Sequence, residues 1–255
     1  MAFVFAVSGK GGVGKTTIAS LLINRLIKKG YKPVLAVDAD PNMCLDSALG
    51  VKVINTIGGI REDARDIAGK GEFKGIAKQD FLQLKVSESL VETENFDLIA
   101  MGRSEGPGCY CYANNALKTI IAEISKNYKY VVLDNEAGLE NLSRRIVQKV
   151  DMLIMVADPS RIGLETLVRL QSLAKEMDIE YKKLVIIVNR IRNAALPKFT
   201  SEVKYYTNAD IVIGLSDDEQ LSEFSEEGKN LFDLPEDNQI LKQIDQLITE
   251  IFTNN

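Results

Sequence analysis

The stretch FVFAVSGKGGVGKT, residues 3–16, decides the fold of this chain. Phe3 to Val7 is a short apolar run, typical of a strand buried on both faces of a parallel sheet. It leads into Gly9 to Thr16, which fits the pattern G-x-x-x-x-G-K-[ST] and opens a segment with helical spacing. Glycines let backbone N–H groups turn around phosphate oxygens, and a helix N-terminus attracts negative charge. The stretch therefore predicts a phosphate site, with a tight glycine turn that binds nothing as the alternative.

The side chains of this loop suit a polyphosphate. Lys15 is expected to reach the β- and γ-phosphates, and the hydroxyl of Thr16 to bind Mg²⁺. Lys10 adds a second cation inside the loop. A polyphosphate with Mg²⁺ is thus the expected ligand. The residues expected to contact the nucleotide here are Gly9, Lys10, Gly11, Gly12, Val13, Gly14, Lys15, Thr16 and Thr17.

Similar apolar runs recur along the chain and alternate with helical patterns, such as the one over residues 16–30 that ends at Gly30. This alternation predicts an α/β fold: a single-domain P-loop NTPase over residues 1–255, with a mostly parallel sheet and helices on both faces. Residues 62–75 are expected to form either a mobile insertion or a solvated helix and loop. The further predicted strands are residues 33–37, 96–101, 130–134, 152–156 and 183–188.

Composition narrows the class of protein. The 31 basic and 36 acidic residues are well mixed and give a net charge of −5, so no basic stripe favours nucleic acid as a partner. The first apolar run is too short for a secretion signal, and no run approaches membrane-spanning length. Three cysteines do not suggest a disulfide framework. We therefore expect a soluble cytoplasmic protein that binds neither nucleic acid nor membrane.

The loop also carries a family resemblance. KGGVGKT, residues 10–16, resembles the deviant Walker A signature of the MinD-type ATPases, which include the nitrogenase iron protein and the partition ATPases. The resemblance spans residues 3 to about 232. It implies ATP hydrolysis and a nucleotide-bridged homodimer. In this family the early lysine reaches the partner's phosphates, so the resemblance implies that Lys10 completes the active site of the other subunit.

Two further stretches fit the same family in the same order. In VDADPN, residues 37–42, Asp40 resembles the switch I aspartate that orients the attacking water, and Asp38 is placed to support Mg²⁺-bound water. VVLDNEAGLEN, residues 131–141, resembles switch II. There Asp134 ends a strand as a Walker B aspartate that holds Mg²⁺ directly or through water, and Gly138 would present its N–H to the γ-phosphate.

The resemblance also implies contacts to the base. Asn189 directly follows a predicted strand, where the family uses an asparagine to hydrogen-bond adenine; a simple turn-forming residue is the alternative. IVIGLSDD, residues 211–218, would supply backbone contacts to the same ring from a loop, with Leu215 as the representative residue.

The segment GPGCYCYANN, residues 106–115, raises a separate question through Cys109 and Cys111. A disulfide between residues two apart would be strained, and two thiolates do not fill a tetrahedral site. The chain has no histidine, but a two-fold dimer would bring four thiolates together, which suits Ni²⁺, Zn²⁺ or an iron–sulfur cluster. Small buried thiols are the alternative. Cys44 is expected to be a core residue rather than a ligand.

This cysteine pair, together with DADPN and DNEAG, resembles the CooC family, whose ATPases support nickel insertion into carbon monoxide dehydrogenase. The resemblance implies an ATP-dependent nickel metallochaperone with the apo-dehydrogenase as its client. Alternatives are a maturation ATPase for another nickel enzyme such as acetyl-CoA synthase, an iron–sulfur carrier, or a MinD-like positioning ATPase. The last needs a basic amphipathic terminal helix, whereas the polar face of residues 239–252 is acidic. We expect that helix to dock on the core.

Overall fold

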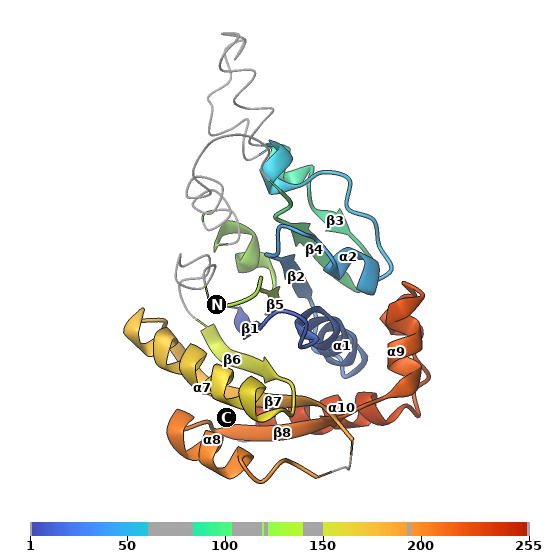
Figure 1. The fold of residues 1–255 in the computed structure, drawn as a ribbon. Helices are drawn as coiled ribbons and strands as arrows, with labels where there is room; N and C mark the ends of the chain where they lie inside the picture. Colours follow the sequence, from blue (N-terminus) through green and yellow to red (C-terminus); the bar gives the residue numbers. More distant parts are fainter. Residues whose placement is uncertain are drawn as a thin grey trace.

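The computed structural model describes residues 2–60, 84–103, 119, 122–139, 150–192 and 195–253, and Figure 1 shows their arrangement. The described residues form an eight-stranded sheet in the order β3-β4-β2-β5-β1-β6-β7-β8. Neighbouring strands are parallel except β3 and β4. Helices cover both faces, so the predicted α/β fold with a mostly parallel sheet is confirmed.

The elements follow the sequence pattern closely. The strands are β1 (Phe3–Gly9), β2 (Val34–Asp38), β3 (Val91–Glu92), β4 (Phe96–Ala100), β5 (Tyr130–Asp134), β6 (Val150–Ala157), β7 (Tyr181–Ile191) and β8 (Ile211–Ser216). The helices are α1 (Lys15–Lys28), α2 (Leu45–Ala48), α7 (Arg161–Glu176), α8 (Thr200–Thr207), α9 (Glu219–Glu226) and α10 (Gln239–Thr253), with 3-10 turns η1 (Ser125–Asn127) and η2 (Leu231–Asp233). All six predicted strands are present.

Strand β8 corrects one expectation. Residues 211–218 were expected to form a loop, but Ile211–Ser216 pair in parallel with β7 at the edge of the sheet. An edge strand is covered less completely than a central one, and four of its six residues are only partly buried. Gly214 fits because a Cβ at that position would lie 1.9 Å from Cδ1 of Ile191. The side chain of Leu215 is buried in the core.

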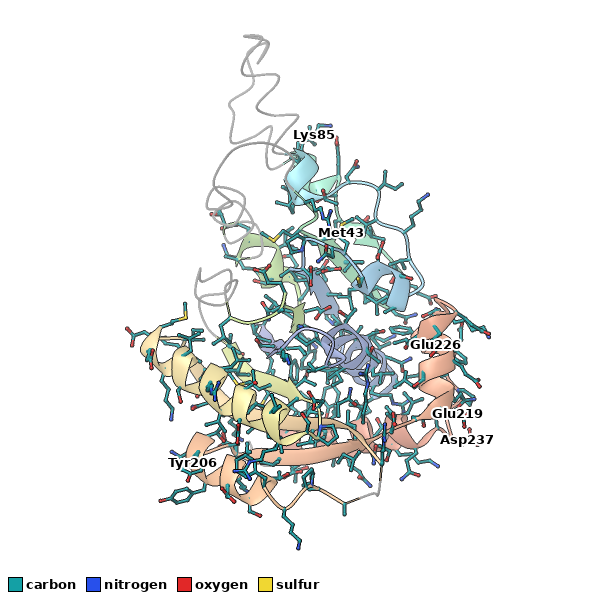
Figure 2. All side chains as sticks on the ribbon, in the orientation of Figure 1. Met43, Lys85, Tyr206, Glu219, Glu226 and Asp237 are labelled. Carbon is teal, nitrogen blue, oxygen red and sulfur yellow. The ribbon has the colours of Figure 1, made fainter. Side chains whose placement is uncertain are left out.

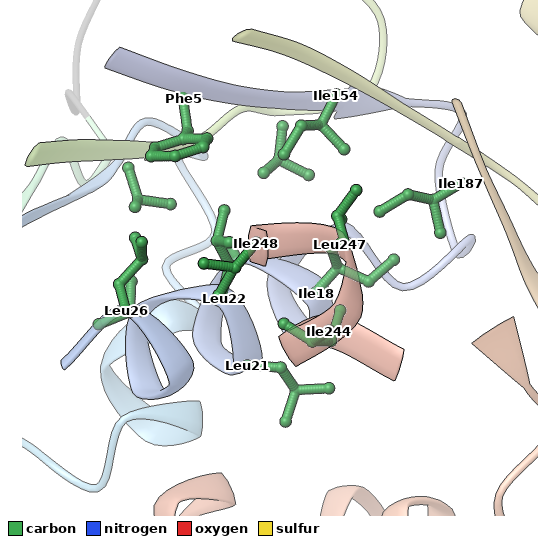
Figure 3. Packing of buried hydrophobic residues seen from close by; sticks show 14 of the residues in the cluster. Phe5, Ile18, Leu21, Leu22, Leu26, Ile154, Ile187, Ile244, Leu247 and Ile248 are labelled. Carbon is green, nitrogen blue, oxygen red and sulfur yellow. The ribbon is translucent and has the colours of Figure 1, made fainter. Parts of the chain in front are cut away.

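One face of the sheet carries α1 and α10, which pack against each other and against the central strands (Figure 3). Leu22 of α1 and Ile248 of α10 lie close to Phe5 of β1. The six apolar residues of α10 that recur at helical spacing are all buried: Ile240, Leu241, Ile244, Leu247, Ile248 and Ile251. The expected docking of this helix on the core is therefore confirmed.

The opposite face is covered in two parts. Leu164 and Leu167 of α7 pack with β6 and β7, and Val203 of α8 joins the same cluster. A second cluster lies over β2, β4 and β5 and includes Ile57 and Ile60 from the segment after α2. Because both faces of the sheet are covered, the central strands are apolar throughout, and their polar side chains gather at the carboxyl ends.

Candidate nucleotide site

The P-loop joins the end of β1 to the start of α1. Gly12 and Gly14 have φ angles of 79° and 95°, in the left-handed region that glycine adopts without strain. Gly14 occupies the N-cap position of α1, which has no side-chain cap and no acidic residue in its first turn. The first N–H groups of α1 are therefore left to an anion from outside the helix.

Close packing at the end of β1 explains the first glycine of the motif. Gly9 has a φ of 147°, and a Cβ on it would lie 2.3 Å from the carbonyl oxygen of Val156 on β6. Any larger residue would push the two strands apart. Gly9 thus fixes where the loop leaves the sheet.

The two lysines of the loop lie in different environments. Lys15 is buried, and its Nζ donates to the carbonyl oxygen of Lys10 at 3.2 Å, so the ammonium lies across the loop. The Lys10 side chain is exposed. Burial opposes the ionisation of Asp158, at the end of β6, but hydrogen bonds from Ser160 and the charge of Lys10 together lower its pKa. The early lysine therefore lies near a carboxylate of its own chain.

Asp134 is the buried carboxylate of the site. It ends β5 and lies opposite Val7 of β1 and Asp38 of β2 in the strand register. Burial raises its pKa to about 7; the side chain of Thr16 lowers it, Asp38 raises it, and Lys15 lowers it. No hydrogen bond of normal geometry to either carboxylate oxygen is found among the described residues. An unpartnered buried carboxylate beside a hydroxyl and a second carboxylate fits a hard divalent cation such as Mg²⁺.

Asp38 is fully buried, but its contacts lie within its own loop. One oxygen accepts from the N–H of Asp40 at 3.0 Å, and the other from Cys44 at 3.1 Å and Leu45 at 3.0 Å. Burial still raises its pKa to about 6 despite these bonds. Asp38 therefore shapes the segment expected to be switch I and starts α2, while lying next to Asp134.

Asp40 lies half-exposed at the rim of the site. Its Oδ1 accepts from the backbone N–H of Asn42 at 2.8 Å and from the Asn42 side chain at 3.0 Å. Asn42 in turn accepts from the guanidinium of Arg103 at 2.5 Å. Sequence reasoning missed Asn42 and Arg103, because the contact joins residues 61 positions apart and no motif marks it. The loop after β2 is thereby tied to the segment that follows β4.

The backbone N–H of Gly138, which was expected to donate to a γ-phosphate, has a hydrogen-bond acceptor within the protein. Its N–H donates to the carbonyl oxygen of Gly9 at 3.1 Å, and the hydroxyl of Ser8 donates to its carbonyl oxygen. This short bridge joins the start of the P-loop to the segment after β5. The N–H expected to face a γ-phosphate is bonded to the P-loop here.

The residues expected to contact the base lie at the ends of β7 and β8. Asn189 is buried, and its side-chain amide donates to the carbonyl oxygen of Val13 at 2.9 Å. Leu215 lies on β8 next to that end of β7, so only its backbone faces the loop region. The structure thus brings Asn189 to the P-loop.

The remaining expectations concern metal and membrane. Cys109, Cys111 and residues 62–75 lie outside the described residues. Cys44 is exposed rather than a core residue, which corrects the expectation for it.

Within the described ranges, no group of three or more cysteine or acidic side chains is arranged to hold a metal ion. None of the helices described there has the length and apolar character to span a membrane. Figure 2 shows Met43, which precedes Cys44 in the sequence, well away from Tyr206 on α8.

Comparisons with known proteins agree with this geometry. Residues 2–187 match the protein family described as AAA domain. An uncharacterized ATP-binding protein of Methanocaldococcus jannaschii is 40% identical over 252 residues, which cover 97% of this chain and 98% of that protein. The carbon monoxide dehydrogenase accessory protein CooC of Rhodospirillum rubrum is 32% identical over 198 residues, 73% of each chain.

Solved structures show the same fold. The cell division ATPase MinD of Pyrococcus furiosus superposes with a TM-score of 0.71 at 20% identity, covering 100% of both chains. A ParA family ATPase of Chlorobium tepidum gives a TM-score of 0.71 at 21% identity, covering 100% of this chain and 99% of the other. The chain therefore has a MinD/ParA-like P-loop fold.

Proposed function

This chain belongs to the AAA domain family of P-loop ATP-binding proteins, and on that premise we propose that it is an ATP-hydrolysing homodimer that delivers Ni²⁺ to an apoenzyme. The observation that carries the nucleotide part is the buried, unpartnered carboxylate of Asp134 beside the P-loop. A group placed in this way gains most from a cation that arrives with the nucleotide.

In this proposal each residue acts on the phosphates from its observed position. Lys15 turns from the carbonyl oxygen of Lys10 to the β- and γ-phosphates. Thr16 and Asp134 would hold Mg²⁺, with Asp38 in support, and the ion would neutralise charge on the phosphates. Asp40 orients the attacking water from the rim of the site. Gly138 gives up its bond to Gly9 and donates to the γ-phosphate.

The exposure of Lys10 supports the dimer part of the proposal. The Lys10 side chain is not buried in its own chain, so in the proposed dimer it would be able to reach the partner's phosphates.

The metal part rests on the relative CooC and on the cysteine pair. Two copies of Cys109 and Cys111 would supply four thiolates to one ion, which is the usual number for a tetrahedral site. The contact between Arg103 and Asn42 supports coupling to ATP, because Arg103 precedes Cys109 by six residues and Asn42 binds Asp40. The proposed client is apo carbon monoxide dehydrogenase. Zn²⁺ suits the same ligands.

Three other functions compete with this proposal. A maturation factor for acetyl-CoA synthase would use the same chemistry with another client. An iron–sulfur carrier would use the same cysteines. A MinD-like positioning ATPase is favoured by the fold, but here the apolar face of α10 is buried against α1 and the sheet. We therefore expect no membrane binding through α10, and the mixed charge of the chain offers no basic stripe to nucleic acid.

An anaerobic titration with Ni²⁺, with and without ATP, tests the proposal. We expect one ion per dimer and tighter binding with ATP, since two sites coupled through one interface affect each other reciprocally. Cys109→Ser and Cys111→Ser should each weaken binding steeply, because each removes two of four ligands. Cys44→Ser is the matched control and should bind normally. One ion per monomer, or normal binding by the Cys109→Ser/Cys111→Ser variant, would refute the shared site.

A further inference from the structure

The end of β7 contacts the P-loop backbone at two consecutive carbonyl groups. Nδ2 of Asn189 donates to the oxygen of Val13 at 2.9 Å, and Nη1 of Arg190 donates to the oxygen of Gly12 at 3.3 Å. The fit at the next residue is close, since a Cβ on Gly14 would lie 2.6 Å from Nδ2 of Asn189. The carbonyl groups of Gly12 and Val13 are thus both held toward the end of β7.

A peptide bond transmits this constraint to its N–H group. A trans peptide places C=O and N–H on opposite sides of the chain, and these bonds are trans. When the oxygens of Gly12 and Val13 turn toward β7, the N–H groups of Val13 and Gly14 turn away from it. Within the described part of the chain, neither N–H group donates to a protein acceptor. Two aligned free donors beside a helix N-terminus suit phosphate oxygens.

The backbone of β7 is distorted where these side chains leave it. In a regular strand, successive side chains point to opposite faces, yet Asn189 and Arg190 both reach the P-loop. The pairing of β7 with β8 shifts register between Val188 and Ile191. Arg190 also has a φ of 59°, a left-handed conformation that is strained for a non-glycine residue. A bulge of this kind re-aims side chains, here toward the loop.

We infer that Asn189 and Arg190 are positioning residues that hold the Gly12 and Val13 carbonyls and thereby orient the loop N–H groups for phosphate. The inference rests on the proposed ATP site and extends the role of Asn189 beyond the base. A primary amide has two N–H donors and one oxygen, so the bond to Val13 leaves one donor and the oxygen for adenine. Arg190, which the sequence analysis did not identify, acts on the loop through its bond to Gly12.

The test uses a ligand that has phosphates but no base. Dissociation constants for ATP and for inorganic tripolyphosphate, both with Mg²⁺, would be measured by calorimetry. Asn189→Ala should weaken both ligands by about tenfold, because it leaves a buried carbonyl without a donor. Arg190→Gly should weaken both by about fivefold while raising or preserving thermal stability, because glycine removes the strained φ. Arg190→Lys keeps a charged donor and should restore most of the affinity.

Arg192→Ala is the matched control. Arg192 lies two residues further on, is exposed, and contacts Asp217 at 3.8 Å rather than the loop, so its loss should change neither constant. If wild-type protein binds no ATP, the proposed function fails. If it binds ATP but not tripolyphosphate, or if Asn189→Ala weakens ATP alone, the amide serves only the base and the inference is wrong. Unchanged constants for Arg190→Gly, which alters an exposed side chain and should fold, would remove Arg190 from the inference.

Discussion

The carboxyl groups of Asp38 and Asp134 end two neighbouring strands directly opposite each other, with no cationic hydrogen-bond partner among the described residues. Burial is the main reason that the pKa of Asp134 rises to about 7 and that of Asp38 to about 6. A carboxyl group whose pKa is raised by folding favours the folded state while it is protonated. Near neutral pH the ionised carboxylates therefore lower the stability of the fold, and a bound cation should offset this loss.

This arrangement predicts how stability depends on pH without nucleotide. The contribution of Asp134 is fully present below its unfolded pKa of 3.8 and is lost as pH rises through about 7. The melting temperature should fall between about pH 4 and about pH 7, and Asp134→Asn should flatten that fall. Mg²⁺ should offset it most at the higher pH. Equal slopes for the two proteins in calorimetric scans would contradict the assignment of Asp134.

Two substitutions, Lys15→Ala and Asp40→Ala, should separate ATP binding from ATP hydrolysis. Lys15→Ala removes the buried charge at the phosphates, so phosphate release should fall by about 100-fold or more. Asp40→Ala alters only the rim of the nucleotide site. The variant should therefore keep its affinity for ATP but lose ATP hydrolysis. Asp46→Ala, a change at a half-buried residue of α2, is the control. Normal turnover by purified Asp40→Ala would overturn the role of Asp40 in orienting water.

At the scale of elements, α10 is part of the core rather than an appendage. Its apolar face packs on α1 and the sheet, and Arg25 of α1 binds Asp245 at 2.7 Å and Glu236 at 2.6 Å. Phe252 stacks on Tyr31 with ring centroids 4.4 Å apart. A helix held in this way stabilises the fold, because its apolar face is buried in the core.

Substitutions in α10 should therefore act on folding. Ile248 is fully buried, so Ile248→Ala should lower the free energy of unfolding by roughly 2–5 kcal/mol. Glu250→Ala, exposed on the same helix, should change it by less than about 0.5 kcal/mol. Urea titration measures both. Sedimentation of the wild type with anionic liposomes would contradict the assignment of α10 to the core.

How far the sequence predicted these elements depended on the length and burial of each. The central strands and α1 were predictable because continuous apolar runs and the P-loop pattern specify them locally. β8 was missed because Gly214 interrupts a half-covered edge strand, and β3 because it has only two residues. In the site, the loop glycines were predictable, whereas the bonds from Arg103 to Asn42 and from Arg190 to Gly12 join distant segments that only the fold brings together.

At the scale of the whole molecule, the proposed role of Lys10 implies a site shared between two subunits. Lys10→Ala and Asp40→Ala are each expected to be inactive alone. A heterodimer of the two would contain one intact site, with Asp40 from one chain and Lys10 from the other. An equal mixture should therefore recover about a quarter of the wild-type rate if exchange is random. No recovery, with heterodimers present by mass measurement, would count against Lys10 acting across the dimer.

The position of the cysteine pair in the chain also bears on how such proteins diversify. Cys109 and Cys111 follow β4 in the sequence, and β4 pairs with β2, which ends at Asp38. The pair belongs to none of the strands and helices that the structure describes. Under the proposed function, exchanging residues 104–118 between related ATPases should change the metal preference and leave ATP binding at the P-loop unchanged. Related proteins could then differ in the metal they deliver while sharing one nucleotide site.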